Sequence, residues 1–377
     1  MNSDITDPPA AHGLPLFSAM LKQHAADFRV HEDLGIEFSG SGEHVYLHIE
    51  KTAMNTDEVA SVLQESYSVS SADIGLCGLK DRHSVSSQWF SVRTAYTADV
   101  FENVAQQFND LQQVNREESG GYVKSMRLLQ NARHARKLKR GAHSGNRFVI
   151  TLQNVRACAG HEPTLKVDVD QRLELIKACG FPGYIGAQRF GFGAQNVQRA
   201  RQWFARPRKR CSRQQRSLWL SSARSALFNI VCAARVRDGS WQSLLEGEPA
   251  VLDGSRSFFS TSEDDVRDDG SGAASLESRI RDFDIHPSAP WWGRGRTAAN
   301  DACAAFEAIH LEANADLCDG LERAGLAQER RALRARPDNL EHSWLSDDAL
   351  ELRFSLSPGV FATTLLRELA CVTEPQR

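Results

Sequence analysis

The chain has 377 residues, of which 41% are apolar and 25% are charged, and its formal net charge at pH 7 is −3. This composition is that of a globular protein and excludes collagen, coiled coil and disorder as descriptions of the whole chain. No uncharged apolar stretch approaches the roughly 20 residues that cross a bilayer, and the first residues lack the basic start and apolar stretch of a signal peptide. We therefore expect a cytoplasmic protein.

Charge is strongly segregated along the chain. Residues 119–161 contain nine Lys or Arg and no acid, and residues 175–237 contain thirteen, again with no acid. Residues 240–286 reverse this pattern, with eleven acids against four Arg. Two acid-free basic stretches are what a surface that follows a phosphate backbone requires. The sequence thus indicates a polyanion-binding protein.

The N-terminal half shows strand and helix patterns in turn. Residues 44–50 alternate apolar and polar side chains as a half-buried strand does. Asn55 with Glu58 three residues later predicts a helix N-cap of the capping-box type. Further elements are predicted at residues 74–77, 88–93 and 147–155 (strands) and 101–113 (helix). This mixture indicates an α/β or α+β fold.

A mainly helical middle follows. The pattern predicts a helix over 168–179, and helical segments dominate to about residue 328, including 222–235 and 298–324. Residues 261–275 are acidic and low in complexity, which predicts a solvated loop. Strand-like alternation returns only at 350–356. Strands in the outer parts and helices in the middle suggest an insertion domain, not two tandem domains.

Two sequence patterns that would indicate a cofactor are missing. The eight cysteines form no CxxC pair, which excludes zinc-ribbon and thioredoxin-type sites on spacing. There is no GxxxxGK[ST] phosphate loop, and the glycines of residues 186–193 do not fit GxGxxG. We expect no bound metal and no nucleotide cofactor.

Residues 78–83, GLKDRH, place one carboxylate between two positive charges. Flanking cations lower the pKa of an aspartate and keep it ionised, which suits a nucleophile or a base. The same cations, Lys80 and Arg82, would attract a phosphate backbone. Taken alone, the segment also fits a tight turn in which the Asp81 side chain binds its own backbone.

The second segment, residues 134–148, combines a basic run with two glycines that let the backbone approach a ligand. Asn146 carries paired donor and acceptor groups that suit a base edge, and Phe148 could stack on a base or begin a buried strand. Two further segments are residues 186–191, GAQRFG, and 354–369, where Phe361 follows a Pro-Gly turn. One carboxylate with aromatic residues near basic runs fits a cofactor-free reaction on an RNA base better than phosphoryl transfer or zinc deamination.

These segments resemble the tRNA pseudouridine synthase D family (TruD) in its bacterial form. The similarity covers nearly the whole chain in the family's order, through residues 26–56, 78–91, 136–148, 182–191, 222–229, 284–295 and 354–369. GLKDRH followed by QWFS, together with QRFG and FATTLLREL, is highly specific. The resemblance implies isomerisation of uridine to pseudouridine in tRNA, at position 13 of tRNAs such as the glutamate acceptor, without a cofactor.

The resemblance also assigns roles to single residues. The family's catalytic aspartate falls on Asp81, and its uridine-contacting residues fall on Phe28, Asn146 and Phe361. Phe148 lies where the family stacks an aromatic ring on the target base, and Lys80 and Arg82 are further substrate-binding candidates. Candidates for RNA-backbone contacts are Arg136, Lys137, Lys139, Arg140 and Arg189. Attack by Asp81 at C6 of the base, attack at C1′ of the ribose, and deprotonation at the 2′ position all stay open.

The implied fold is an α/β (α+β) pseudouridine-synthase catalytic core with a mixed or antiparallel sheet, interrupted by a mainly helical TruD-specific insertion domain. We expect residues 1–171 and 331–377 to form the catalytic domain and 172–330 the insertion. Two departures from the family pattern, at 183–187 and 289–293, fall in the insertion and bear on tRNA docking. The expected partner is tRNA, with no membrane and no obligate protein partner.

Two other functions fit parts of the sequence less well. A non-catalytic RNA-binding or tRNA-folding protein on the same fold would need the basic stretches but not Asp81 in its full motif. A metal-dependent nuclease built on the acids of 263–269 would place them in a Gly/Ser-rich loop, far in sequence from any basic or aromatic motif.

Overall fold

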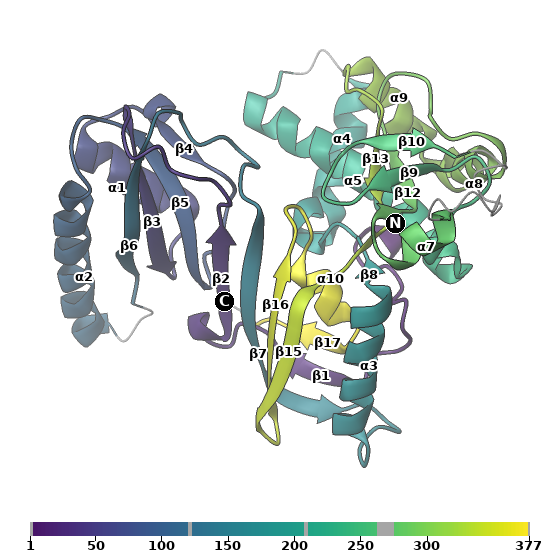
Figure 1. Ribbon diagram of the computed structural model, residues 1–377, viewed down its shortest axis with the longest axis horizontal. Helices are drawn as coiled ribbons and strands as arrows, with labels where there is room; N and C mark the ends of the chain where they lie inside the picture. The colour runs from purple at the N-terminus through teal and green to yellow at the C-terminus, as the bar shows by residue number, and fades with distance from the viewer. Residues whose placement is uncertain (1–2, 120–122, 207–209, 262–274, 376–377) are drawn as a thin grey trace. The chain divides into compact units, whose positions relative to one another are not determined.

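The computed structural model describes residues 3–119, 123–206, 210–261 and 275–375. The chain forms two compact units, each assembled from segments that are distant in sequence (Figure 1). We call them the sheet unit (16–165, 337–359 and 370–377) and the helical unit (1–15, 166–336 and 360–369). The expected domain limits, 1–171, 172–330 and 331–377, stay a prediction. The nuclease candidate at 263–269 lies outside the described residues.

The sheet unit is built on one ten-stranded mixed sheet. Its main path has the order β15-β16-β7-β2-β5-β3-β6, while β4 pairs with β5, and β1 pairs with both β7 and β17. The β2–β5 and β1–β17 pairs are parallel and the others antiparallel. The strands are β1 (Phe17–Met20), β2 (Phe28–Asp33), β3 (His44–Thr52), β4 (Ile74–Leu76), β5 (Val85–Arg93), β6 (Ser125–His134), β7 (Gly145–Ala157), β15 (Asp338–Ser346), β16 (Ala349–Leu356) and β17 (Ala370–Thr373). This confirms the expected mixed sheet.

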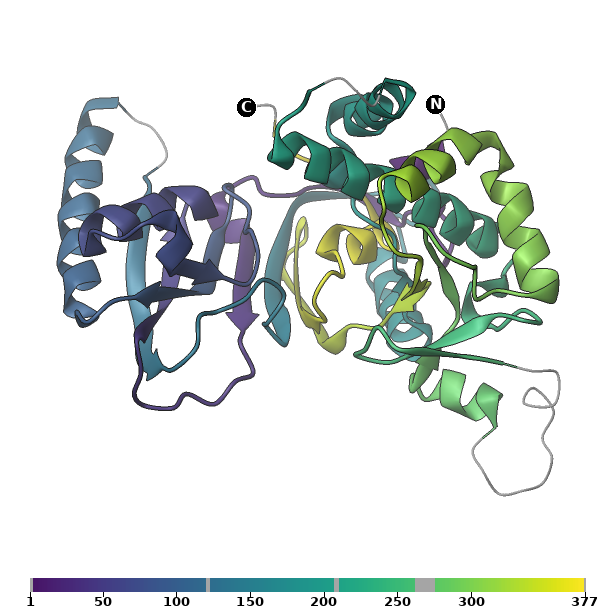
Figure 2. The same cartoon turned by 90° about the horizontal axis from the view of Figure 1, so that it is seen from above.

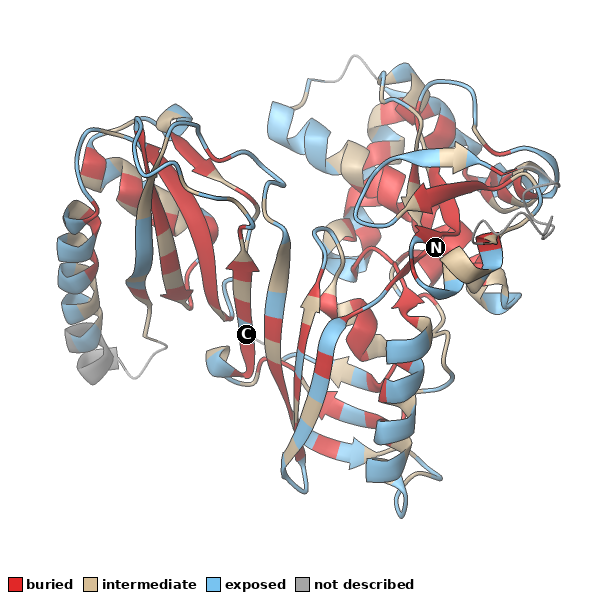
Figure 3. Cartoon of the chain, in the orientation of Figure 1, coloured by how far each residue is buried: buried red, intermediate tan, exposed pale blue. Residues whose placement is uncertain are grey.

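Two helices pack on the β5-β3-β6 part of this sheet. Helix α1 (Thr56–Tyr67) begins after Asn55, whose capping box with Glu58 is present as predicted. Its buried residues Val59 and Leu63 lie four residues apart on one face and join the core under β3 and β5. Helix α2 (Asp99–Ser119) packs beside α1, with its exposed face turned to solvent (Figure 3).

The helical unit is organised around helix α5 (Arg213–Arg237). Every residue from 222 to 235 is buried: most side chains of this stretch are apolar or small, and the polar Arg224, Asn229 and Arg235 are hydrogen-bonded or ion-paired. Helices α4 (Gln195–Ala205), α8 (Asp301–Leu311) and α9 (Ala315–Arg323) pack against it (Figure 2). The unit also holds α3 (Leu165–Cys179), α7 (Leu276–Arg281) and α10 (Ala362–Arg367). Among the described residues, no helix combines the length and the apolar character needed to span a membrane.

The expectation that strand alternation returns only at 350–356 was wrong. Among its described residues, the helical unit carries seven short strands, β8 (Phe181–Pro182), β9 (Pro249–Leu252), β10 (Phe258–Ser260), β11 (Ile285–His286), β12 (Ser288–Trp291), β13 (Glu329–Ala332) and β14 (Arg334–Ala335). They escaped the pattern because they are two to four residues long, and β9 is apolar throughout and does not alternate. The helical pattern over 298–324 resolves into α8 and α9, separated by a 3₁₀ turn at Glu312–Asn314.

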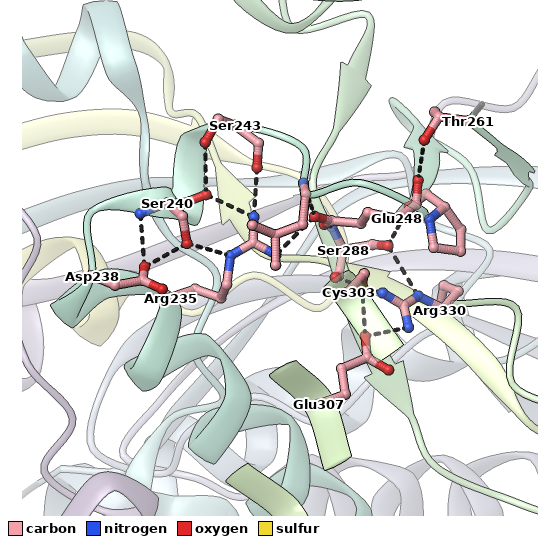
Figure 4. Close-up of polar contacts among 12 residues, drawn as sticks. Arg235, Asp238, Ser240, Ser243, Glu248, Thr261, Ser288, Cys303, Glu307 and Arg330 are labelled. Carbon is pink, nitrogen blue, oxygen red and sulfur yellow. Dashed lines mark hydrogen bonds and ion pairs between the residues drawn. The ribbon is translucent and has the colours of Figure 1, made fainter. Parts of the chain in front are cut away.

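Two buried ion pairs tie the short strands of the helical unit to its helices (Figure 4). Arg235 of α5 donates to Glu248 at 2.8 Å, and both side chains are shielded from solvent. Arg330 of β13 donates to Glu307 of α8 at 2.6 Å, also buried. Ser288 links the pairs, since its amide donates to Glu248 and its hydroxyl accepts from Arg330. A buried charge is tolerated only when it is paired and hydrogen-bonded in this way.

Candidate active site

The Asp81 carboxylate lies on the loop between β4 and β5, and its side chain is about half exposed. The Lys22 ammonium donates to it at 2.9 Å and to Glu374 at 3.1 Å. The same ammonium lies 4.7 Å from the centre of the Phe28 ring. The Lys22 ammonium is therefore held by the predicted nucleophile Asp81, by Glu374 and by the face of the Phe28 ring.

Lys22 keeps its charge in this setting. Burial by itself lowers the pKa of the ammonium, but Asp81 and Glu374 outweigh that effect, and the pKa is raised. The Lys22 side chain is 10% exposed, whereas that of Asp81 is 52% exposed. The cation is thus set into the protein surface, while the carboxylate stays accessible to a substrate.

Backbone contacts fix the loop that carries Asp81. The carbonyl oxygen of Asp81 accepts from the Lys51 ammonium at 2.9 Å and from the Ser84 hydroxyl at 2.8 Å. On the preceding residue, the Lys80 amide donates to the Thr56 hydroxyl at 2.9 Å. The main chain on both sides of the carboxylate is therefore held, while the carboxylate itself is bound by Lys22 and stays half exposed.

Lys51 is the most unusual member of this set, because its side chain is completely buried. Its ammonium donates to the carbonyl oxygens of Met54 and Asp81. Burial lowers the pKa of Lys51 to about 8, against an opposing attraction from Asp81. A second amine group therefore contacts Asp81, at its carbonyl oxygen, whereas Lys22 contacts its carboxylate.

The side chains of Lys80 and Arg82 have different surroundings. Lys80 pairs with the buried carboxylate of Glu32 at 2.6 Å, and its own side chain is 8% exposed. Glu32 also accepts from the Trp89 amide at 3.0 Å. Lys80 therefore anchors the loop to β2, whereas Arg82 is exposed and available to a phosphate.

Two of the predicted aromatic residues, Phe28 and Phe148, lie on one face of the sheet. Strand register pairs Phe148 of β7 with Phe354 of β16 and with Val30 of β2, two residues from Phe28. The Phe148 ring is stacked on Phe354 at 5.3 Å and meets the edge of Phe28 at 6.2 Å. Phe28 and Phe148 are 5% and 8% exposed. Phe148 thus begins a buried part of β7, and its ring packs against other aromatic rings.

Asn146 lies two residues from Phe148 on the same face of β7. Its register partners are Glu32 of β2 and Leu356 of β16. The side-chain oxygen of Asn146 is buried and has no hydrogen-bond partner in the structure. An unsatisfied buried acceptor is costly, and such groups concentrate where a ligand completes the bonding.

The basic run leaves its cations exposed on a well-fixed loop. Leu138 in its middle is buried, with its amide donating to Ser91 at 2.9 Å, and the Gly141 amide donates to Cys77 at 2.9 Å. The exposed cations of this loop are Arg136, Lys137, Lys139 and Arg140. The sheet unit therefore carries Phe28, Asn146 and Phe148 on neighbouring strands of one sheet. Asp81 and the basic run lie on loops that connect strands of the same sheet.

The remaining two candidates belong to the helical unit. Phe361 is the N-cap residue of α10, half-buried against the apolar core of that unit. Arg189 is half-buried in a 3₁₀ turn, and burial lowers the pKa of its guanidinium.

One group of side chains in the sheet unit has the donor types of a metal site. Atoms of Glu32, Cys77 and His143 lie within 4.8 Å of one another. Glu32 is already paired with Lys80, and burial raises the pKa of the Cys77 thiol to about 12. A protonated thiol and a neutralised carboxylate are poor metal ligands, so these residues fit packing beside the Asp81 loop better than metal binding.

Sequence reasoning missed Lys22, Lys51 and Glu32. Lys22 is 59 positions from Asp81 in the chain, and Glu32 is 48 positions from Lys80. No local pattern marks a residue whose partner is brought to it only by sheet pairing. The lysine in a strand that otherwise alternates, Lys51, was the one visible signal, because a charged residue at a buried position needs a partner.

Comparisons with known proteins agree with this geometry. A family model described as tRNA pseudouridine synthase D (TruD) matches residues 12–200 and 194–369. A tRNA pseudouridine synthase D from Methylococcus capsulatus is 43% identical over 96% of this chain and 94% of its own length. One from Pseudomonas putida is 40% identical over 96% and 94%.

Among solved structures, a protein of Methanosarcina mazei assigned as tRNA pseudouridine synthase D superimposes with a TM-score of 0.68. It is 17% identical, and the match covers 97% of this chain and 96% of that one, so this likeness speaks for the fold. The family model and the relatives at about 40% identity, each over nearly the whole length, carry the assignment. The chain therefore belongs to the tRNA pseudouridine synthase D family, isomerases that convert uridine to pseudouridine in tRNA.

Proposed function

We propose that this enzyme isomerises uridine 13 of glutamate-acceptor-type tRNAs, with Asp81 as the nucleophile. The observation that carries the catalytic assignment is the Asp81 carboxylate itself. It is accessible, it lies 2.9 Å from a cation, and its main chain is held by Lys51 and Ser84. A carboxylate held in this way can attack a substrate without first reorganising the loop that carries it.

The reaction breaks the N1–C1′ bond, turns the uracil and joins its C5 to C1′. The C5 proton is lost and N1 gains one, so no redox partner or cosubstrate is consumed. Asp81 supplies the carboxylate for this exchange, and the charge of Lys22 holds that carboxylate in place. Flipping a stacked uridine into the site costs a few kcal/mol, which phosphate contacts and aromatic contacts offset.

We assign substrate recognition to the residues around Asp81. The unpartnered side-chain oxygen of Asn146 suits a donor on the uracil edge, such as N3–H. Phe28 and Phe148 form an apolar wall for the flipped base, and the Lys22 ammonium lies over the Phe28 ring. Phe361, from the helical unit, is a further uridine contact, and Lys80 holds the loop through Glu32.

The tRNA backbone is proposed to follow the two acid-free stretches. In the sheet unit these contacts come from Arg82 and from the loop cations Arg136, Lys137, Lys139 and Arg140, and in the helical unit from Arg189. Because several phosphates are neutralised, the affinity for tRNA should fall steeply with salt concentration. We place the reaction in the cytoplasm, without an obligate protein partner or a metal ion.

The test maps pseudouridine by carbodiimide treatment and primer extension on unmodified glutamate tRNA. The tRNA is incubated with the wild-type enzyme, with Asp81→Asn, and with the wild-type enzyme in EDTA. The expected result is one new stop that reports pseudouridine at position 13, present in both wild-type reactions and absent with Asp81→Asn. A transcript with cytidine at position 13 is the control, and it should give no stop.

Other outcomes would change the assignment. A stop elsewhere would replace position 13, and a stop with Asp81→Asn would remove that residue as the nucleophile. Loss of activity in EDTA that added metal restores would overturn the metal-free reaction. Tight tRNA binding without a stop for the wild-type enzyme would favour a tRNA-folding protein on the same fold.

A further inference from the structure

Phe192 is the most exposed large apolar side chain that the structure describes, at 92%. It belongs to the helical unit, in the loop that follows Arg189 and precedes helix α4. Its neighbours on either side, Phe190 and Ala194, are buried in the core of that unit. The chain therefore leaves the core after Phe190, exposes the Phe192 ring, and returns to the core at Ala194.

The backbone holds the ring outward. Gly191 and Gly193 flank it with φ of +70° and +58°, a conformation in which a residue with a side chain is strained. A Cβ at Gly191 would also lie 3.0 Å from the side chain of the buried residue Asn196. The Ala194 amide donates to the Gly191 carbonyl at 3.1 Å and closes the turn.

The loop is also anchored immediately before the turn. The Arg189 carbonyl accepts from the Ser222 hydroxyl of α5 at 2.8 Å. The same carbonyl accepts from the Asn196 amide group of α4 at 3.4 Å. A single exposed apolar residue is ordinary on a protein surface. Phe192 differs because its loop is fastened to two helices, so its exposure is part of the fold.

The segment that carries this ring is positively charged. No Asp or Glu occurs between residues 175 and 237. No carboxylate of the described residues opposes the effect of burial on the Arg189 guanidinium. Arg199 of α4 is exposed and donates to Gln195 at 3.3 Å, so its guanidinium lies along the start of the helix that follows the loop. A protein partner would bring mixed charges, whereas an exposed ring in an arginine-rich segment without acids suits a nucleic acid.

We propose that Phe192 is a stacking site for an unpaired nucleobase of the bound tRNA, with Arg189 and Arg199 contacting the adjoining phosphates. This inference rests on the proposed function, and it adds a tRNA contact of the helical unit to the contacts proposed for the uridine. The ring would accept any base, because every base has an aromatic face. It therefore contributes affinity without sequence preference.

The experiment measures the Kd of unmodified glutamate tRNA at fixed salt for four variants. Phe192→Ala should weaken binding by about 5- to 100-fold. Phe192→Trp should bind as well as the wild type or better, and Phe192→Leu should resemble Phe192→Ala, because leucine is apolar but cannot stack. Ile309→Ala is the matched control, since Ile309 is 70% exposed on α8 of the same unit, and its Kd should stay within about twofold.

Each outcome decides the inference. A Kd for Phe192→Ala equal to that of Ile309→Ala would overturn it, and so would full binding by Phe192→Leu. Pseudouridine formation by the wild-type enzyme is measured in the same samples. Wild-type tRNA binding without pseudouridine would remove the proposed function but still leave the Kd series to judge Phe192. Normal pseudouridine formation with an unchanged Kd for Phe192→Ala would remove the stacking site alone.

Discussion

Two ion pairs of nearly equal length have opposite surroundings. Lys22 meets Asp81 at 2.9 Å in the sheet unit, and Arg235 meets Glu248 at 2.8 Å in the helical unit. The Asp81 side chain is 52% exposed, whereas Glu248 is completely buried. The first carboxylate can reach a substrate, and the second can reach only its own protein.

The difference shows that burial determines whether a charged pair contributes to stability or stays available to a substrate. A pair open to water contributes little to stability, because water solvates both partners when they separate. A buried pair cannot be broken from one side without leaving an unpaired charge, which is strongly unfavourable. We therefore expect changes at Asp81 to affect the reaction and changes at Glu248 to affect folding.

The largest effect is expected from Asp81→Asn. Removing the nucleophile should lower kcat by about 10⁴-fold or more, because the remaining contacts only bind and orient the base. The free energy of unfolding should change by less than about 1 kcal/mol. Single-turnover kinetics and urea denaturation of the same preparation check both halves. A large loss of stability would place Asp81 among the structural residues.

The converse variant is Glu248→Gln. It leaves Arg235 charged and buried, so the free energy of unfolding should fall by about 3–5 kcal/mol. The matched control is Glu43→Gln, which breaks the exposed Arg93–Glu43 pair. This pair has a similar N–O distance, and its loss should lower the free energy of unfolding by less than about 1 kcal/mol. Urea denaturation of both variants makes the comparison. Equal losses would contradict the role of burial.

Glu368 is a buried carboxyl whose contribution to stability depends on pH. Burial raises the pKa of this carboxyl from 4.5 to about 7, although the amides of Ala11 and His12 donate to it. The folded state therefore binds the proton more tightly, and stability is lost as the pH rises from about 4.5 through about 7. Glu368→Gln cannot ionise, so it should remove about 3 kcal/mol of this pH dependence. Thermal unfolding between pH 5 and pH 8 measures it, and an unchanged slope would contradict the assignment.

A smaller loss of activity is expected from Lys22→Met, which removes a largely buried cation and leaves Asp81 and Glu374 half exposed to water. It should lower kcat by about 10- to 100-fold, since Asp81 loses the charge that orients it. Stability should change by less than about 1 kcal/mol. Lys124→Met is the control, because Lys124 pairs with Glu58 outside the site. Its kcat should stay within about twofold of the wild type, and equal losses for both variants would remove the special role of Lys22.

Local sequence determined several elements well. The capping box at Asn55, the strand of residues 44–50 and the helix of 168–179 all lie where the pattern predicted them. These predictions hold because capping and amphipathic spacing act between residues close in the chain. The short strands of the helical unit were missed, because their pairing partners, such as β12 for β13, lie far away in sequence.

The motif around Asp81 and the family resemblance were visible in the sequence alone, since they depend on residue order. Only the tertiary structure decided which groups meet there. Lys22 and Glu374 are 352 positions apart, and Lys51 reaches the Asp81 carbonyl from a neighbouring strand. Sheet pairing sets these neighbours, because contact between distant segments depends on burial and register and not on local composition.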